Sequence, residues 1–321
     1  MKKYTKITKQ CINKYILYLL LLLVIVSIFI FTFLFSNRKK NEYFILDVQN
    51  SSDILISNGN PNTNTIPKII WTFWNEEKLP YIIDSCINSW KKHNPEFEIN
   101  ILNTTNYNAY LPDLNISDQK NLSDSFARKS DVIRLNILRK YGGTWLDASI
   151  ICNASLQWIL DLQQKYKVEC VAYYLKKFTD QSFIKTSPVI ESWFISCTSQ
   201  SQFIADWCNE FMSINNYNSV DHYIYHTVNA GTSVQHIDIP NYLAIHVAAQ
   251  KIVQQPNNYN LYLLRAEDEP YLFLDNNFSE FSESIPKLAS GIYNHLKIIK
   301  LTGDHRKYFI EHNIPIDKLF I

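Results

Sequence analysis

The sequence has 321 residues, a formal net charge of +1 at pH 7, and 46% hydrophobic and 14% aromatic residues. This composition excludes an intrinsically disordered chain and provides core-forming residues for one large or two small domains. The near-neutral charge argues against a nucleic-acid-binding protein, which usually presents a strongly basic face. Nucleic acid is therefore not an expected partner.

A long apolar segment lies near the N-terminus, from Tyr15 to Phe35, and carries no charged residue, glycine or proline. A helix of this length crosses a hydrocarbon core about 30 Å thick. No small-residue cleavage site follows the segment, which favours a retained anchor over a cleaved signal peptide. We expect a tail over residues 1–14 and a transmembrane helix over residues 15–36.

Basic residues flank this segment unequally, with Lys2, Lys3, Lys6, Lys9 and Lys14 before it and Arg38, Lys39 and Lys40 after it. The positive-inside rule therefore favours a cytoplasmic N-terminus and a single-pass type II membrane protein. The remainder of the chain is then expected to be lumenal or exocytoplasmic. In such a compartment the N-x-S/T sequences are glycosylation acceptors; they begin at Asn50, Asn103, Asn115, Asn121, Asn153 and Asn277.

Residues 37–65 are polar and rich in Ser and Asn, a composition typical of a flexible stem. The folded domain is expected to begin at residue 66 and to continue to residue 321, because no further linker divides it. Residues 68–74, KIIWTFW, are apolar, β-branched and aromatic, which is typical of a buried strand.

Helices and strands alternate after this first strand. Pro80 opens a helix with apolar residues at helical spacing that ends near Asn94 and Pro95, and residues 97–102 alternate like a second strand. Residues 122–143 predict a long helix that stops at Gly142, and TWLDASI follows as a strand that leads into a loop. This succession predicts an α/β fold with a mostly parallel sheet flanked by helices.

Asp147 places a charge at the end of an apolar strand, where burial is costly unless a partner is present. Ligand sites of parallel sheets lie beyond the carboxyl ends of the strands. A carboxylate there could hold a divalent cation that neutralises a departing diphosphate. Gly142 and Gly143 would let the backbone turn closely beside it. Asp131 and Arg134, one helical turn apart, could hold donor hydroxyls and a phosphate respectively. Trp71 or Trp74, at the end of the first strand, could offer a flat face for the donor base.

Three stretches carry a specific resemblance: IPKIIWTFW, CINSWKKHNPEFEINILN and FARKSDVIRLNILRKYGGTWLDASI. Together they resemble the capsular polysaccharide synthesis family of glycosyltransferases, which is related to mannosyltransferases and clostridial glucosylating toxins with a D-x-D motif. Later blocks at residues 187–207 and 295–303 are also similar to that family. The resemblance spans about residues 66–303, and the combination S-D-x-x-R…Y-G-G-x-W-x-D is its most specific part.

The resemblance implies a GT-A (nucleotide-diphospho-sugar transferase) fold, a nucleotide-sugar donor and a divalent cation, manganese or magnesium. It implies that Trp71 stacks on the donor base, while Asp131 and Arg134 contact the donor sugar and phosphate. Asp147 matches the first aspartate of D-x-D and is the expected metal ligand. Ser149 stands where the second aspartate would be and could supply a weaker or water-mediated ligand, so dependence on a metal is in doubt.

His295 is a further candidate for a late ligand or phosphate contact, with Lys297 and Lys300 nearby on the same segment. Structural interpretations remain open for each of these residues. His295 could be a satisfied structural histidine, Trp71 and Trp74 could be core aromatics, and Asp147 could cap a turn. His222 and His226 have zincin-like spacing without the glutamate of that motif, which favours a helix face over a zinc site.

Asp131 and Arg134 could equally form a surface ion pair. With the resemblance included, the sequence predicts a membrane-anchored glycosyltransferase that moves a hexose from a nucleotide-sugar, most simply a UDP-sugar, to a glycan or capsule-type acceptor. One alternative is a catalytically dead membrane protein that binds nucleotide-sugar or glycan. Another is a sugar-phosphate transferase, which would release a nucleoside monophosphate.

Overall fold

The computed structural model describes residues 52–274, 281–314 and 319–320. The chain divides into two compact units, Met1–Ser52 and Asp53–Ile321, and the second contains all the elements that follow. The expected tail at 1–14 and transmembrane helix at 15–36 lie outside the described residues. In the part of the chain that is described, no helix combines the length and the apolar character needed to span a bilayer.

The described elements are nine strands, nine α-helices and five 3₁₀ turns. The strands are β1 Ile54–Ser57, β2 Ile69–Phe73, β3 Glu98–Leu102, β4 Gly143–Leu146, β5 Ile150–Cys152, β6 Cys170–Tyr174, β7 Ile190–Cys197, β8 Asn260–Arg265 and β9 Ile298–Lys300. The α-helices are α2 Tyr81–His93, α3 Tyr107–Tyr110, α4 Phe126–Tyr141, α5 Gln157–Tyr166, α6 Gln202–Met212, α7 Val220–Asn229, α8 Ala244–Val253, α9 Phe281–Ala289 and α10 Gly303–Glu311. The 3₁₀ turns are η1 Ile116–Asp118, η2 Lys176–Phe178, η3 Ser213–Asn216, η4 Ala266–Asp268 and η5 Leu272–Leu274.

Seven strands form one sheet in the order β1-β8-β6-β7-β4-β2-β3, and β5 pairs with β9 in a second, two-stranded sheet. Parallel pairing joins β3 to β2, β2 to β4 and β6 to β8. Antiparallel pairing joins β4 to β7, β7 to β6 and β8 to β1. The expectation of a mostly parallel sheet is therefore wrong for the pairing, and the sheet is mixed. The reason is that β7 inserts between β4 and β6 in the opposite direction.

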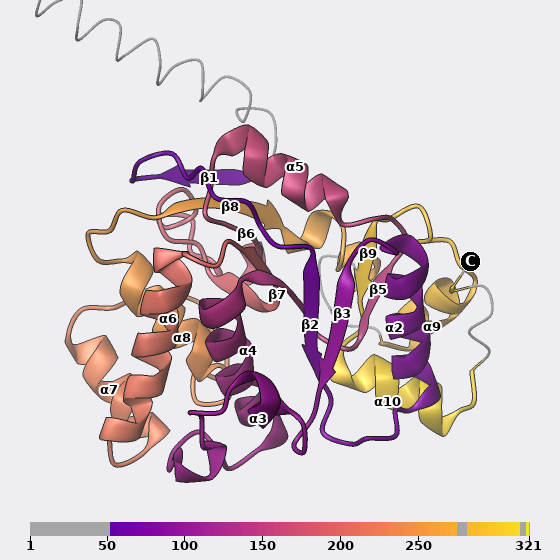
Figure 1. The fold of residues 1–321 in the computed structure, drawn as a ribbon, viewed down its shortest axis with the longest axis horizontal. Coiled ribbons are helices and arrows are strands. Elements are labelled where there is room, and N and C mark those ends of the chain that lie inside the picture. Colours follow the sequence, from indigo (N-terminus) through magenta and orange to yellow (C-terminus); the bar gives the residue numbers. More distant parts are fainter. Residues whose placement is uncertain (1–51, 275–280, 315–318, 321) are drawn as a thin grey trace, which may run out of the picture. The chain divides into compact units, whose positions relative to one another are not determined.

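Two hydrophobic cores cover the two faces of the large sheet. Helices α4, α6, α7 and α8 pack on one face, while α2, α5, α9, α10 and the small sheet pack on the other (Figure 1). Strand β6 demonstrates the alternation that feeds both cores, because Cys170 and Ala172 belong to the first and Val171 and Tyr173 to the second. The chain thus forms the predicted α/β architecture with helices on both faces.

The stem expected over residues 37–65 contains a strand of the large sheet. Residues 54–57 form β1, whose Ile54 and Ile56 are buried and whose backbone pairs with Leu263 and Leu261. The folded part therefore extends N-terminal of the predicted boundary at residue 66. A four-residue edge strand with two inward apolar side chains is too short to stand out within a polar segment.

The motif Y-G-G ends α4 and begins β4 with two unusual backbone conformations. Gly142 has φ of 65° and Gly143 has φ of 91°, a region that favours glycine. A Cβ on Gly143 would lie 2.7 Å from the Ile69 carbonyl oxygen on the neighbouring strand β2. The glycines therefore let β4 approach β2 closely, and this approach sets the position of Asp147 one residue after β4.

Substituting Gly143→Ala is expected to lower the free energy of unfolding by more than the roughly 1–3 kcal/mol that backbone strain alone costs, because the added methyl group also meets β2. Gly231→Ala is the matched control, since Gly231 has φ of 97° but no atom within 4 Å of an added Cβ. Urea denaturation of both variants measures the difference. Equal losses would contradict the role assigned to close strand approach.

Candidate functional site

Asp147 lies at the carboxyl edge of the large sheet, in the turn that joins β4 to β5. Its backbone N–H donates to the Trp193 carbonyl of β7 at 2.9 Å, and its own carbonyl accepts from the Ile150 N–H at 3.0 Å. The turn carries the chain directly from the large sheet into the small one. Pairing of Ile150 with Lys300 in the small sheet then brings β9 alongside this turn.

Helix α4 supplies Asp131 and Arg134 to the same place. The Arg134 guanidinium donates from Nη1 to Asp131 Oδ1 at 2.7 Å and from Nη2 to Asp147 Oδ1 at 2.8 Å. It also lies over the Trp145 ring, with 5.0 Å between the guanidinium carbon and the ring centroid. Arg134 is only 4% exposed, so this is a buried arrangement and not the surface ion pair that spacing alone would favour. The structure therefore brings the three predicted residues together.

Lys300 completes the cluster from the opposite side of Asp147. Its Nζ donates to Asp147 Oδ2 at 3.0 Å and to Ser149 Oγ at 2.8 Å. Trp145 Nε1 adds a third donor, 3.1 Å from Asp147 Oδ1. Hydrogen bonds from two cations and one indole therefore satisfy both oxygens of the Asp147 carboxylate.

These neighbours shift the pKa values of the two carboxyl groups in opposite directions. Burial raises the pKa of Asp147, but the positive charges of Lys300 and Arg134 outweigh burial, and the pKa lies well below its usual range. Burial also raises the pKa of Asp131, and Arg134 compensates only partly, so the pKa is about 6. The difference follows from the number of adjacent cations, because Lys300 bonds Asp147 and not Asp131.

The predicted metal ligands, Asp147 and Ser149, do not fit a divalent cation in this arrangement. Such an ion needs several oxygen ligands, and here the Lys300 ammonium already lies between the Asp147 and Ser149 oxygens. In the described part of the chain, no group of three or more His, Cys, Asp or Glu side chains is arranged to hold a metal. The expected manganese or magnesium site at these two residues is therefore not supported by the side chains that surround it.

Trp71 does not lie where it could stack on a donor base. Its side chain is 2% exposed, and its Nε1 donates to the Gly142 carbonyl at 3.0 Å. Its ring packs against Tyr110 and Tyr141, with centroids 5.2 and 5.4 Å away. Trp71 is thus a core residue that helps hold the Y-G-G turn, and the interpretation as a core aromatic was the right one.

Trp74, one residue after β2, has the features that Trp71 lacks. It is partly exposed at the carboxyl edge of the sheet, and its Nε1 has no hydrogen-bond acceptor among the described residues. The Arg306 guanidinium of α10 lies 5.8 Å from its ring centroid. An aromatic face beside a cation is suited to a base and its phosphate.

Comparison with known proteins now decides the family. The profile of the capsular polysaccharide synthesis protein family matches residues 30–313, which is most of the chain. The chain belongs to the capsular polysaccharide synthesis protein family. This confirms the predicted family and, with it, the predicted enzyme class of glycosyltransferase.

Comparison with curated proteins found no match for this family member. Among solved structures, PaToxG glycosyltransferase is 12% identical with a TM-score of 0.36, over 88% of this chain and 92% of its own. Mouse xyloside xylosyltransferase 1 is 8% identical with a TM-score of 0.41, over 74% and 98%. The WbbM bifunctional glycosyltransferase is 14% identical with a TM-score of 0.41, over 77% and 47%. These low scores add nothing to the family assignment.

His295 of this capsular polysaccharide synthesis protein is not part of the Asp147 cluster. It is exposed, and its Nδ1 contacts the Ile292 carbonyl at 3.0 Å. The residue of that segment that reaches the cluster is Lys300, which sequence analysis named only as a neighbour. A signal for Lys300 was present, because it is a charge next to an apolar strand, like Asp147.

His222 and His226 lie on α7, with 2.9 Å between their Nε2 atoms, as expected for a helix face.

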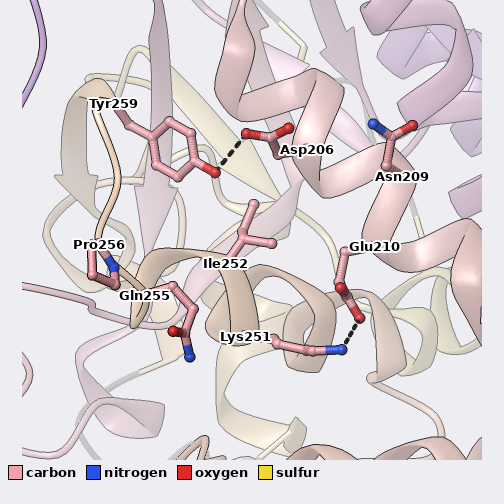
Figure 2. A pocket seen from close by; sticks show the side chains of 8 residues that line it. All are labelled: Asp206, Asn209, Glu210, Lys251, Ile252, Gln255, Pro256 and Tyr259. Carbon is pink, nitrogen blue, oxygen red and sulfur yellow. Dashed lines mark hydrogen bonds and ion pairs between the residues drawn. The ribbon is translucent and has the colours of Figure 1, made fainter.

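A separate surface pocket of about 370 Å³ lies between α6, α8 and the start of β8 (Figure 2). The charged side chains that line this pocket have partners: Glu210 pairs with Lys251, and Asp206 accepts a hydrogen bond from the Tyr259 hydroxyl. The start of β8 is at the sheet edge opposite Asp147, so this pocket does not belong to the site.

Proposed function

We propose that this family member is a GT-A-type transferase that moves a hexose from a nucleotide-sugar to a glycan or capsular-polysaccharide-type acceptor. The observation that carries the proposal is the ion-paired chain of Asp131, Arg134 and Asp147 at the carboxyl edge of the sheet, with Arg134 buried between two partly exposed carboxylates. Enclosing charges in this way costs free energy, and carboxyl groups with strongly shifted pKa values cluster at functional sites. A UDP-sugar is the first donor to test.

The residues at this edge match the parts of such a donor. Trp74 offers a partly exposed aromatic side chain on which the base can stack. Arg306 beside it supplies positive charge for the diphosphate. The carboxylate of Asp131 can accept hydrogen bonds from sugar hydroxyls while Arg134 holds it in place.

Anchoring in a membrane is part of the proposal. It rests on the uncharged apolar segment at residues 15–36 and on the larger number of basic residues before it. The protein would then be of type II, with its catalytic domain lumenal or exocytoplasmic. That placement suits an enzyme that acts on a surface glycan.

The decisive experiment incubates the purified full-length protein in detergent with a panel of nucleotide-sugars and separates the released nucleotides by chromatography. We expect one donor to yield a nucleoside diphosphate, in slow hydrolysis without acceptor and faster with one. Release of a nucleoside monophosphate would instead identify a sugar-phosphate transferase. Binding of a nucleotide-sugar by calorimetry without any turnover would identify a binding protein with an inactive site.

A further inference from the structure

The Lys300 ammonium lies between the two groups that the family resemblance would assign to a metal. Strand β9 pairs with β5 so that Lys300 faces Ile150, one residue beyond Ser149. The Lys300 side chain is 8% exposed, and its Nζ is 3.0 Å from Asp147 Oδ2 and 2.8 Å from Ser149 Oγ. These are hydrogen-bond lengths, so the ammonium occupies the space between the two oxygens that a shared metal ion would need.

The charges of the cluster balance without an added ion. Two carboxylates, Asp131 and Asp147, face two cations, Arg134 and Lys300. In the absence of a bound diphosphate, a divalent ion placed here would leave two uncompensated positive charges or would have to displace Lys300 from a buried position, and both are costly. Burial lowers the pKa of Lys300, and the Asp147 carboxylate opposes that lowering.

The cluster also has a side that a donor can reach. The Asp147 side chain is 26% exposed, so solvent reaches the cluster of Asp131, Arg134, Asp147 and Lys300 next to the Lys300 ammonium. An ammonium has three N–H donors, and two of them bond Asp147 and Ser149. Within the described residues the third donor has no acceptor. Arg306 lies near enough for its charge to act on Lys300, and it also lies over Trp74.

We propose that Lys300 takes the place of a divalent cation in this enzyme and stabilises the departing diphosphate directly. The inference rests on the proposed function. In the step, the acceptor hydroxyl oxygen bonds to the anomeric carbon as the bond from that carbon to the diphosphate oxygen breaks. The bonding electron pair leaves with the diphosphate, and the Lys300 ammonium stabilises the negative charge that develops on the diphosphate oxygen. The hydroxyl proton passes to the leaving diphosphate.

The first test is calorimetric binding of UDP, and separately of GDP, to the full-length protein in EDTA and then in manganese chloride. We expect the dissociation constant of the nucleotide that binds to differ by less than about twofold between the two conditions. Lys300→Met is expected to weaken binding about tenfold or more, which corresponds to one lost charge-assisted hydrogen bond. Lys297→Met is the matched control, because Lys297 is exposed three residues earlier, with Nζ 4.4 Å from the Trp158 ring centroid.

A second test measures the metal itself, through the electron paramagnetic resonance signal of free manganese. The natural protein with UDP is expected to remove no more of that signal than UDP alone removes. The double variant Lys300→Ala with Ser149→Asp removes the ammonium and restores a second carboxylate, and we expect it to bind manganese and to become metal-dependent in donor hydrolysis.

The outcomes separate this inference from the proposed function. If the natural protein binds nucleotide only with manganese, the Lys300 inference is wrong while the proposed function stands. If neither nucleotide binds under any condition, the proposed function fails and the inference fails with it. Should Lys300→Met lose its thermal unfolding transition, the comparison of EDTA with manganese on the natural protein still decides the matter.

Discussion

Asp147→Asn is expected to reduce donor turnover by about 10²–10³-fold, the cost of removing one preorganised electrostatic group from a transition state. The carboxylate orients two cations at once, Arg134 on Oδ1 and Lys300 on Oδ2. Asparagine has one acceptor oxygen and one donor nitrogen, so one of these cations would face another donor instead of an acceptor. The groups that stabilise the diphosphate would then lose their common anchor.

The measurement is nucleoside diphosphate release at saturating donor, with far-UV circular dichroism as the check on folding. Asp161→Asn on the exposed surface of α5 is the matched control and should retain full turnover. We expect Asp147→Asn to stay folded, because its side chain is partly open to solvent and water can satisfy the orphaned groups. Full turnover in this variant would refute the site.

The elements around the site were largely predictable because local signals define them. The strand at 69–73, the helix at 81–93 and the strand at 98–102 match their predicted ranges within two residues. Helix α4 stops at the predicted place, with Tyr141 its last residue and Gly142 its C-cap, but it begins at residue 126 instead of 122. The Ser125 hydroxyl accepts from the Arg128 N–H and caps the helix there. Ser123 is also a possible cap in the sequence, so the sequence alone does not determine where the helix begins.

What could not be predicted depends on contacts between distant parts of the chain. The antiparallel insertion of β7 beside β4 depends on pairing of residues about 50 apart, such as Leu146 with Phe194. Trp71 lies in β2 and Trp74 one residue after it, and only the packed structure determines which of them is enclosed. Lys300 contacts Asp147 from 153 residues further along the sequence. A local sequence pattern cannot predict a contact between residues this far apart.

Arg134→Met is expected to lower the free energy of unfolding by about 3–5 kcal/mol, the usual cost of removing one partner from a buried ion pair. Methionine fills most of the space over Trp145 but leaves Asp131 without its cation, while Asp147 keeps Lys300. The loss should therefore come mainly from Asp131. Urea denaturation of the purified protein, followed by tryptophan fluorescence, measures it.

The sign of the pH dependence identifies the cause. Burial already raises the pKa of Asp131 to about 6, and loss of Arg134 raises it further. The folded variant then binds the Asp131 proton more tightly than the unfolded chain, whose pKa is about 3.9, so stability falls as pH rises through that interval. The deficit relative to the natural protein should be larger at pH 7.5 than at pH 5.

A double variant completes the argument. Asp131→Asn added to Arg134→Met removes the uncompensated carboxylate, so we expect it to recover part of the lost stability and to remove the growth of the deficit between pH 5 and pH 7.5. If the double variant instead loses the sum of the two single effects at every pH, Arg134 contributes through packing on Trp145 and not through its charge. The buried ion pair would then have no energetic meaning for the fold, and its retention would have to be explained by catalysis alone.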